Sequence, residues 1–262
     1  MLIELLASGV QPGIIVAVSA GALNGAFLAF EPSLAMAERI AELWRRVTTR
    51  EALGLSWRSV FGMLGMRGHL ADSKGLRALL ERELPYRSFD ATRVPLHIVA
   101  AEEATGREVL LTRGDVLQAV LASTAIPGVF APVRLDGRDL VDGVIASGTP
   151  IATAVRLGAK HVIVLPCGFT CVEQSVPRHA LGRAMHAVAL LGARQLRQDF
   201  DRYCESVKLR LVPPLCPLRH SSYDYSHGAL LISEARASTR RWLDGGGLDR
   251  EDFPHELIVH SH

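Results

Sequence analysis

The stretch VAVSAGALNGA, residues 16–26, decides how this sequence folds. An apolar, strand-forming run ends at Ser19, and the small residues that follow it are compatible with a helix. Such a junction can be a plain strand-to-helix turn in which the serine has no chemical role. It can also be a sharp elbow that holds a nucleophilic hydroxyl clear of a sheet. The stretch by itself leaves both alternatives open.

An elbow of this kind needs small residues two positions before and after the nucleophile, because the strand and the helix approach closely there. Those positions hold Ala17 and Gly21, so the pattern is A-x-S-x-G instead of G-x-S-x-G. A serine at a helix N-terminus also lies beside free N–H groups that favour a developing oxyanion. We therefore expect Ala17 and Gly21 to support the turn, and the backbone N–H of Ala20 to be an oxyanion donor.

Working outward, strand patterns alternate with helical patterns along the whole chain. Apolar runs typical of strands covered on both faces occur at 14–18, 95–101, 161–166 and 207–212. Helices are predicted at 20–30, 34–47, 74–83, 115–123, 150–157, 179–203 and 228–243. Asp136-Gly137 between two short runs predicts a β-hairpin. The alternation predicts an α/β protein with a mostly parallel central sheet.

The chain of 262 residues shows no linker or repeat that would divide it. We therefore expect one domain over residues 1–244, followed by a C-terminal tail at 245–262. Gly245-Gly246-Gly247 at that boundary is interpreted as a helix cap or the start of a flexible tail.

Composition excludes several function classes. The net charge of +2 comes without a dense basic stripe, so no nucleic-acid partner is expected. The four cysteines have no paired metal spacing, and no phosphate loop or nucleotide fingerprint is present. We expect neither a metal nor a cofactor. The oligomeric state cannot be read from the sequence.

The N-terminal region carries no charge between Glu4 and Glu31. A signal peptide would need a basic n-region, whereas the first basic residue is Arg39. Pro12 and Asn24 also interrupt the run, which argues against a membrane span. We predict that this segment is buried core and that the protein is cytoplasmic.

A conspicuous acid follows the predicted hairpin, within LVDGVIASGTP (residues 140–150). Asp142 precedes Gly143 and is flanked by apolar residues. An Asp-Gly turn is the common use of that pair. Alternatively, partial burial and hydrogen bonds tune this carboxylate to act as a base.

Four segments follow one another along the chain: VSAGALNGA (18–26), VLASTAIPGVFAPV (120–133), LVDGV (140–144) and DYSHGALLISEA (224–235). These segments and their order resemble the patatin-like phospholipase family over nearly the whole chain. The resemblance implies a three-layer α/β/α acyl hydrolase of the phospholipase A, lysophospholipase or esterase type. Ser19 matches the family's nucleophile, and Asp142 matches the aspartate of its Ser-Asp dyad, which works without histidine. The Asp142-Gly143-Val144 motif departs from the family's D-G-G/A pattern in its third place.

The resemblance also concerns Ser123-Thr124, which it implies helps to shape the active site. The alternative for these residues is a helix-terminating turn before Pro127.

Members of the family normally begin with a strand and a glycine-rich loop, G-G-G-x-R/K-G, that forms the oxyanion hole. This sequence begins inside the helix that follows that loop. We therefore expect an incomplete oxyanion hole, and an unpaired edge on the strand before Ser19. A catalytically impaired remnant with a regulatory or lipid-binding role is the alternative to an active lipid esterase. The predicted helix at 179–203 carries several arginines, which indicate either transient contact with a membrane surface or a solvated helix face.

Overall fold

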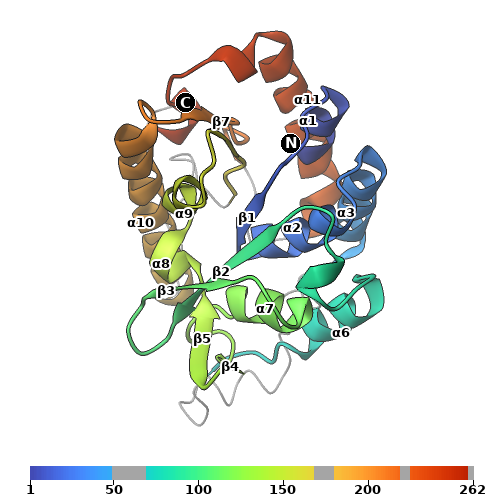
Figure 1. Ribbon diagram of the computed structural model, residues 1–262, viewed down its shortest axis with the longest axis vertical. Helices are drawn as coiled ribbons and strands as arrows, with labels where there is room; N and C mark the ends of the chain where they lie inside the picture. Colours follow the sequence, from blue (N-terminus) through green and yellow to red (C-terminus); the bar gives the residue numbers. More distant parts are fainter. Residues whose placement is uncertain (49–68, 168–179, 219–224, 259–262) are drawn as a thin grey trace. The chain divides into compact units, whose positions relative to one another are not determined.

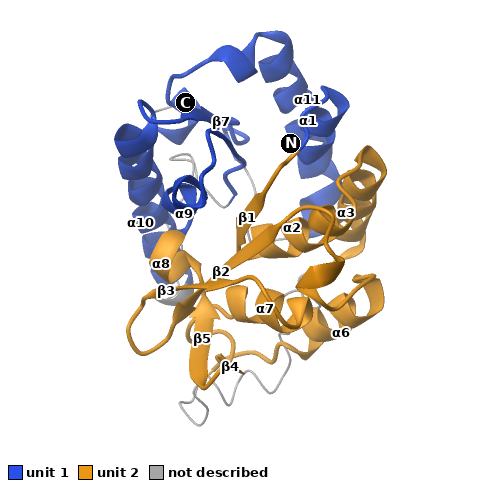
Figure 2. Ribbon diagram, viewed as in Figure 1, with its two compact units in different colours: residues 1–11, 148–262 blue, residues 12–147 orange. Residues whose placement is uncertain are grey.

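A computed structural model describes residues 1–48, 69–167, 180–218 and 225–258 (Figure 1). These residues form two compact units, one made of residues 12–147 and the other of residues 1–11 and 148–262 (Figure 2). His179, Asp224 and residues 259–262, which belong to predicted segments, lie outside the described residues. The single domain over residues 1–244 stays a prediction.

The unit of residues 12–147 alternates strands and helices as the sequence predicts. Its strands are β1 (Ile15–Val18), β2 (Leu96–Glu102), β3 (Glu108–Leu111), β4 (Val133–Leu135) and β5 (Arg138–Asp142). Its helices are α2 (Ala20–Phe30), α3 (Leu34–Arg46), α6 (Lys74–Glu83), the 3-10 turn η1 (Phe89–Ala91), α7 (Val116–Ser123) and α8 (Val144–Ser147). The α/β class is confirmed.

Pairing in this sheet follows the order β1-β2-β5-β4, with β3 also bonded to β2. Parallel pairing joins β1 to β2, whereas β3, β4 and β5 pair antiparallel to their neighbours. The predicted parallel character thus holds here for β1 and β2 only. For β4 and β5 the reason is their short connection: Asp136 and Gly137 both have positive φ and close a tight hairpin, which only antiparallel strands can share.

The register brings the ends of two strands together. Val99 pairs with Val18 at the end of β1, and the next residue, Ala100, pairs with Asp142 at the end of β5. Because β3 pairs with both Val99 and Ala100 along one edge of β2, β1 and β5 must share the other edge, end to end. The residue after Val18 therefore lies beside Asp142, although they are far apart in the chain.

The core of this unit is formed where α2 and α7 pack against β1 and β2 and against each other (Figure 1). Most of its largest fully buried side chains come from α2, β2 and α7, with one each from α6 and β5: Leu23, Phe27, Leu80, Ile98, Val99, Val116, Leu117, Val120, Leu121 and Leu140. This packing fixes the positions of the helix ends that surround Val99 and Val18.

The second unit contains helices at both ends of the chain and a two-stranded sheet. Its elements are α1 (Leu2–Ala7), α9 (Ile151–Arg156), β6 (His161–Val164), α10 (Ala180–Tyr203), β7 (Lys208–Leu211), the 3-10 turn η2 (Tyr225–His227), α11 (Gly228–Asp244), and the 3-10 turns η3 (Gly247–Asp249) and η4 (His255–Leu257). Strands β6 and β7 pair in parallel, as the sequence predicts. Among the described helices, none is both long enough and apolar enough to cross a bilayer.

A buried carboxylate joins α1 to α11. Glu4 is 3% exposed and accepts hydrogen bonds from Arg236 Nε at 2.8 Å and Arg240 Nη2 at 2.6 Å. Burial raises the pKa of Glu4, but the bonds from Arg240 and Arg236 outweigh it and hold that pKa below its usual range. Helix α1 is therefore anchored by charge as well as by its apolar face.

Residues after 244, predicted as a tail, contact the rest of this unit. The Arg210 guanidinium donates to the Leu248 carbonyl at 2.6 Å, and the Phe253 ring packs edge-on against Phe200 at 5.2 Å. Cap geometry explains the start of the segment, since Gly246 has a left-handed φ of 75° and a side chain at Gly247 would overlap the Trp242 ring. The segment up to residue 258 is packed rather than extended.

Candidate active site

Ser19 stands at the turn between β1 and α2, where the sequence predicts an elbow. It is the N-cap of α2 and has φ 53° and ψ −127°, a left-handed conformation that non-glycine residues rarely adopt. Such a conformation costs about 1–3 kcal/mol and persists only where its surroundings impose it. The strain indicates that this turn is more than a simple connection.

The Ser19 side chain does not perform the usual task of a serine at an N-cap. An N-cap hydroxyl normally accepts a bond from an N–H of the first helical turn. Ser19 makes no such bond, and its Oγ instead donates to Asp142 Oδ2 at 2.7 Å. The hydrogen bond that the elbow interpretation requires is therefore present, and a structural turn would not need it.

Asp142 is the last residue of β5, and only 1% of its surface is exposed. Its Oδ1 accepts from the Val144 N–H at 2.9 Å, and its own N–H donates to the Ala125 carbonyl at 2.9 Å. Together with the bond from Ser19, these contacts leave the carboxylate little freedom to rotate.

Burial dominates the electrostatics of this carboxylate. It raises the pKa of Asp142 from 3.8 to about 6, although the bonds from the Val144 N–H and the Ser19 hydroxyl act in the opposite direction. A carboxylate with a pKa near 6 is ionised at neutral pH, yet it accepts a proton far more readily than an exposed aspartate. Asp142 is thus suited to take a proton from a hydroxyl and to return it.

Gly143 allows Asp142 to reach this position. A Cβ at Gly143 would overlap the Val99 carbonyl oxygen and would lie 2.8 Å from Val18 Cγ2. Only glycine lets the chain pass so close to the ends of β1 and β2. From the sequence, Gly143 is interpreted as part of an Asp-Gly turn, whereas in the structure its backbone lies close to the neighbouring strand β2.

The close approach between β1 and α2 lies elsewhere than the sequence predicts. Ala17 is buried, as expected for a residue that faces the helix. A Cβ at Gly25 would lie 3.0 Å from Ala17 Cβ, whereas a Cβ at Gly21 meets nothing within 4 Å in the described chain. Gly25 is therefore the residue that lets the helix rest on the strand. Gly25 lies four residues after Gly21, so both are on one face of the helix, and this spacing could have identified Gly25 from the sequence.

Ser123, the last residue of α7, lies directly behind the elbow. It is fully buried, accepts a hydrogen bond from the Ser19 N–H at 2.8 Å and donates one to the Val99 carbonyl at 2.6 Å. The hydroxyl of its neighbour Thr124 donates to carbonyls of its own helix, those of Val120 and Leu121. Of the two hydroxyl groups, that of Ser123 is therefore the one that hydrogen-bonds to the candidate site among the described residues.

The donors that could receive an oxyanion come from the start of α2. The N–H groups of Ala20 and Gly21 have no acceptor among the residues that the structure describes, whereas the Ser19 N–H is engaged by Ser123. Strand β1 pairs only with β2 within the described chain, so its other edge lacks a strand partner there. The N–H of Ala20, which the sequence predicts as an oxyanion donor, is thus available within the described chain, and its role as a donor stays a prediction.

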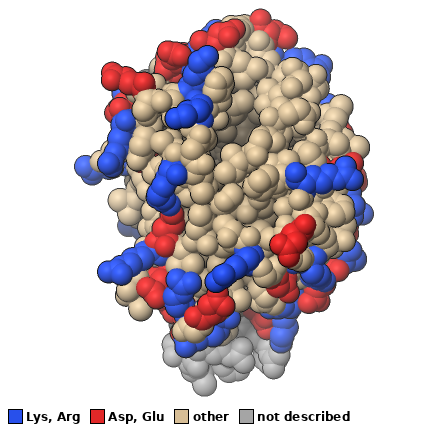
Figure 3. Space-filling model, in the orientation of Figure 1, with Lys and Arg blue, Asp and Glu red and all other residues tan. Residues whose placement is uncertain are grey.

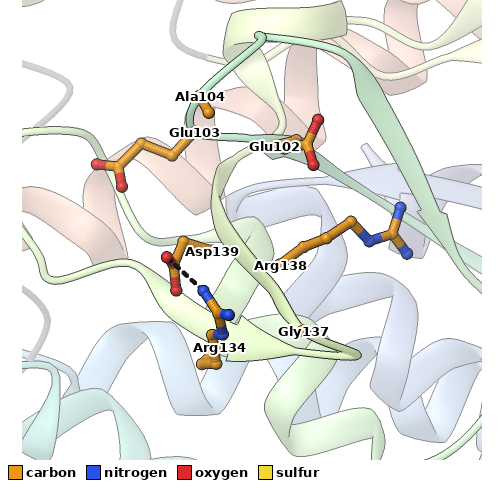
Figure 4. Close-up of a pocket in the computed structure, with 7 residues that line it drawn as sticks. All are labelled: Glu102, Glu103, Ala104, Arg134, Gly137, Arg138 and Asp139. Atoms are coloured by element: carbon orange, nitrogen blue, oxygen red, sulfur yellow. Dashed lines mark hydrogen bonds and ion pairs between the residues drawn. The ribbon is translucent and has the colours of Figure 1, made fainter.

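A charged hollow lies at the far end of β2 and beside the β4–β5 hairpin (Figure 4). It is lined by Glu102, Glu103, Ala104, Arg134, Gly137, Arg138 and Asp139. Arg134 and Asp139 form an ion pair at 2.7 Å, and neither member of the Ser19–Asp142 pair lines the hollow. We assign it no part in the chemistry.

Two further observations concern possible metal ligands and the distribution of surface charge. The described residues hold no group of three or more His, Cys, Asp or Glu side chains placed to bind a metal ion. Lys and Arg side chains are intermixed with Asp and Glu side chains on the face shown in Figure 3.

A strained serine at a strand–helix turn, hydrogen-bonded to a buried aspartate on an α/β sheet, has the geometry of a nucleophile elbow. A family model described as patatin-like phospholipase matches residues 2–155, and the chain belongs to that family. Family membership carries the three-layer α/β/α fold class that the sequence predicts.

Relatives include uncharacterized NTE family proteins of Mycobacterium bovis and Mycobacterium tuberculosis. Each is 39% identical to this chain over 72 residues, which is 28% of this chain and 20% of the relative. The aligned part thus spans about one fifth of the length of these relatives.

Proposed function

We propose that this chain is a serine acyl hydrolase that cleaves carboxylic esters of lipids, with Ser19 as nucleophile and Asp142 as general base. One observation carries the proposal: the 2.7 Å hydrogen bond between a serine held at φ 53° and a carboxylate that is 1% exposed. Membership of the patatin-like phospholipase family indicates lipid acyl hydrolysis in general terms and supports the same conclusion.

The mechanism follows from these contacts. Ser19 Oγ attacks the ester carbonyl carbon while its proton passes to Asp142 Oδ2. Negative charge then develops on the carbonyl oxygen and is received by the N–H groups of Ala20 and Gly21, which have no acceptor in the described part of the chain. Collapse of this intermediate expels the alcohol, which takes the proton back from Asp142 and leaves an acyl-serine. In the second half, Asp142 takes a proton from a water that attacks the acyl-serine, the bond to Ser19 Oγ breaks, and Oγ takes that proton back from Asp142 as the carboxylic acid leaves.

A fluorophosphonate probe tests the assignment of the nucleophile. It phosphonylates an activated serine with loss of fluoride, so we expect intact-mass and peptide analysis to place the label on Ser19. Ser19→Ala should abolish labelling, while Ser33→Ala, which removes the N-cap hydrogen bond of α3, should leave it unchanged. Labelling of the folded wild type at another serine, or at none, would contradict the proposal.

One observation favours a second candidate, a catalytically impaired protein with a regulatory or lipid-binding role. Among the described residues, the oxyanion donors are limited to the start of α2. Loss of one such donor lowers rates by about 10²–10³-fold. If the folded wild type binds a long-chain fatty acid or its ester analogue but neither reacts with the probe nor hydrolyses esters, this second function is the correct one.

Helix α10 supports a proposal on localisation, a cytoplasmic protein in transient contact with an anionic membrane. Leu190 and Leu191 are 50% and 66% exposed, and Arg183 and Arg194 lie on the same helix face. No acidic residue occurs between Ala180 and Gln198. Exposed leucines between arginines are the pattern of a helix that inserts its apolar side chains among anionic headgroups.

Vesicle binding measures this contact. We expect Leu190→Ser/Leu191→Ser to lower the partition coefficient on phosphatidylglycerol-containing vesicles by about 10-fold or more, because two leucines no longer enter the bilayer. Leu34→Ser, at a leucine of α3 that is 44% exposed, is the matched control and should bind like the wild type. Equal partitioning of all three proteins, or equal binding to uncharged phosphatidylcholine vesicles, would contradict a role for α10.

A further inference from the structure

Ser123 occupies a position that the proposed reaction does not use directly. It ends α7, none of its surface is exposed, and its hydroxyl lies between the Ser19 N–H and the Val99 carbonyl. Three separate elements, α7, β2 and the elbow, therefore meet at one side-chain oxygen.

The direction of both hydrogen bonds is fixed by chemistry. A backbone carbonyl can only accept, so the single hydroxyl proton of Ser123 points to Val99 at 2.6 Å. The lone pairs of the same oxygen then face the Ser19 N–H at 2.8 Å. The hydroxyl cannot reverse without leaving a buried donor or acceptor unpaired.

This bond acts on the backbone of the strained residue itself. Because φ of Ser19 is 53°, rotation of the Val18–Ser19 peptide toward an ordinary strand conformation would relieve strain and carry Oγ away from Asp142. Such a rotation must break the bond between the Ser19 N–H and Ser123. The neighbouring Ala125 carbonyl holds the Asp142 N–H at 2.9 Å, so residues 123–125 restrain both members of the pair.

We propose that Ser123 is the positioning residue of this hydrolase: it holds the Ser19 peptide so that Oγ faces Asp142. The proposal rests on the function proposed above. It has a further consequence for the oxyanion, because Ser123 withholds the Ser19 N–H and leaves the donors to Ala20 and Gly21.

Kinetics of Ser123→Ala provide the first test, with a short-chain p-nitrophenyl ester as substrate. We expect kcat to fall by about 10- to 100-fold with KM within about threefold of wild type, because the loss is in alignment and not in substrate binding. The acid limb of the pH profile should remain, with its midpoint at or above the wild-type value, because Asp142 still titrates and loss of the bond from the Ser19 hydroxyl raises its pKa. Loss of the acid limb, or a midpoint below the wild-type value, would overturn the positioning role.

Ser33→Ala is the matched control for lost stability. Ser33 Oγ accepts a hydrogen bond from the Met36 N–H at 3.1 Å and caps α3 away from the elbow. Its loss should lower Tm by a similar amount while kcat stays at the wild-type value. If both variants lose kcat in proportion to Tm, or if Ser123→Ala retains wild-type kcat, the proposal is wrong.

Hydrogen exchange at the Ser19 amide tests the same contact without any turnover. In Ser123→Ala we expect this amide to exchange at least about 10-fold faster than in wild type and in Ser33→Ala, because its acceptor is gone. Absence of esterase activity in the wild type would defeat the proposed function but not this measurement. Unchanged exchange would overturn the positioning role whatever the activity.

Discussion

Ser19→Ala is expected to lower kcat/KM for a short-chain p-nitrophenyl ester by at least about 10³-fold, because no other group replaces the attacking oxygen. Asp142→Asn is expected to lower it by about 10²–10⁴-fold, since the amide has the shape of the carboxylate and can still accept from the Val144 N–H, but cannot accept the Ser19 proton. Asp139→Asn is the matched control. That aspartate lies on the same strand, β5, but pairs with Arg134 at the surface, so its replacement should leave the rate unchanged.

The pH dependence of the wild type belongs to the same prediction. Because burial raises the pKa of Asp142 to about 6, kcat/KM should rise about tenfold per pH unit below that value and level off above it. Steady-state rates between pH 4.5 and 8.5 measure this limb. A limb centred near 4, as for an exposed aspartate, would contradict the assignment of Asp142 as the base.

The free energy of unfolding should fall as the pH rises, which is the opposite of the expected change in kcat/KM. With a pKa of about 6 in the folded protein and 3.8 as its ordinary value, Asp142 holds its proton more tightly when folded, so stability falls as pH rises between those values. A pKa difference of about 2 corresponds to about 3 kcal/mol. The side-chain amide of the Asp142→Asn variant does not titrate. The free energy of unfolding of this variant relative to wild type should therefore increase by about 3 kcal/mol between about pH 4 and pH 8. Urea unfolding at both pH values checks the gain, and parallel curves would contradict it.

Gly143→Ala is expected to destabilise the unit of residues 12–147 by more than about 3 kcal/mol, because the new methyl group overlaps a backbone carbonyl that cannot move aside. The carbonyl belongs to Val99, and Val18 Cγ2 lies 2.8 Å from the same point. Relief would require Asp142 to withdraw from Ser19, so activity should be lost together with stability.

Two glycines calibrate this result. Gly25→Ala meets side chains at 3.0 Å and 3.1 Å and should cost about 1–3 kcal/mol. Gly192→Ala meets nothing within 4 Å in the described part of the chain and lies within α10, so it should stabilise by about 0.5–1 kcal/mol. Urea midpoints should follow the order Gly192→Ala, wild type, Gly25→Ala, Gly143→Ala. A Gly143→Ala midpoint at or above that of wild type would contradict the contact.

The local sequence determined the elements and the two residues that meet. Apolar runs and helical periodicity depend on neighbours along the chain, so strands such as β1 and β2 and helices such as α2 and α7 were predictable. Ser19 and Asp142 were also predictable as a pair, through the order of segments shared with the patatin-like phospholipases. The Asp136-Gly137 turn was predictable because its backbone conformation selects those residue types.

Only the tertiary structure decided how these elements pair and which small residues matter. The antiparallel pairing of β5 with β2, end to end with β1, depends on contacts between distant segments that no local pattern records. The same is true of the close approach at Gly25 and of Ser123, whose donor partner and acceptor partner lie 104 and 24 residues away in sequence, respectively. Burial of Asp142, which raises its pKa to about 6, likewise arises only when β5 is covered on the folded sheet. The sequence thus determined which groups are available for chemistry, and packing decided their distances and their proton affinities.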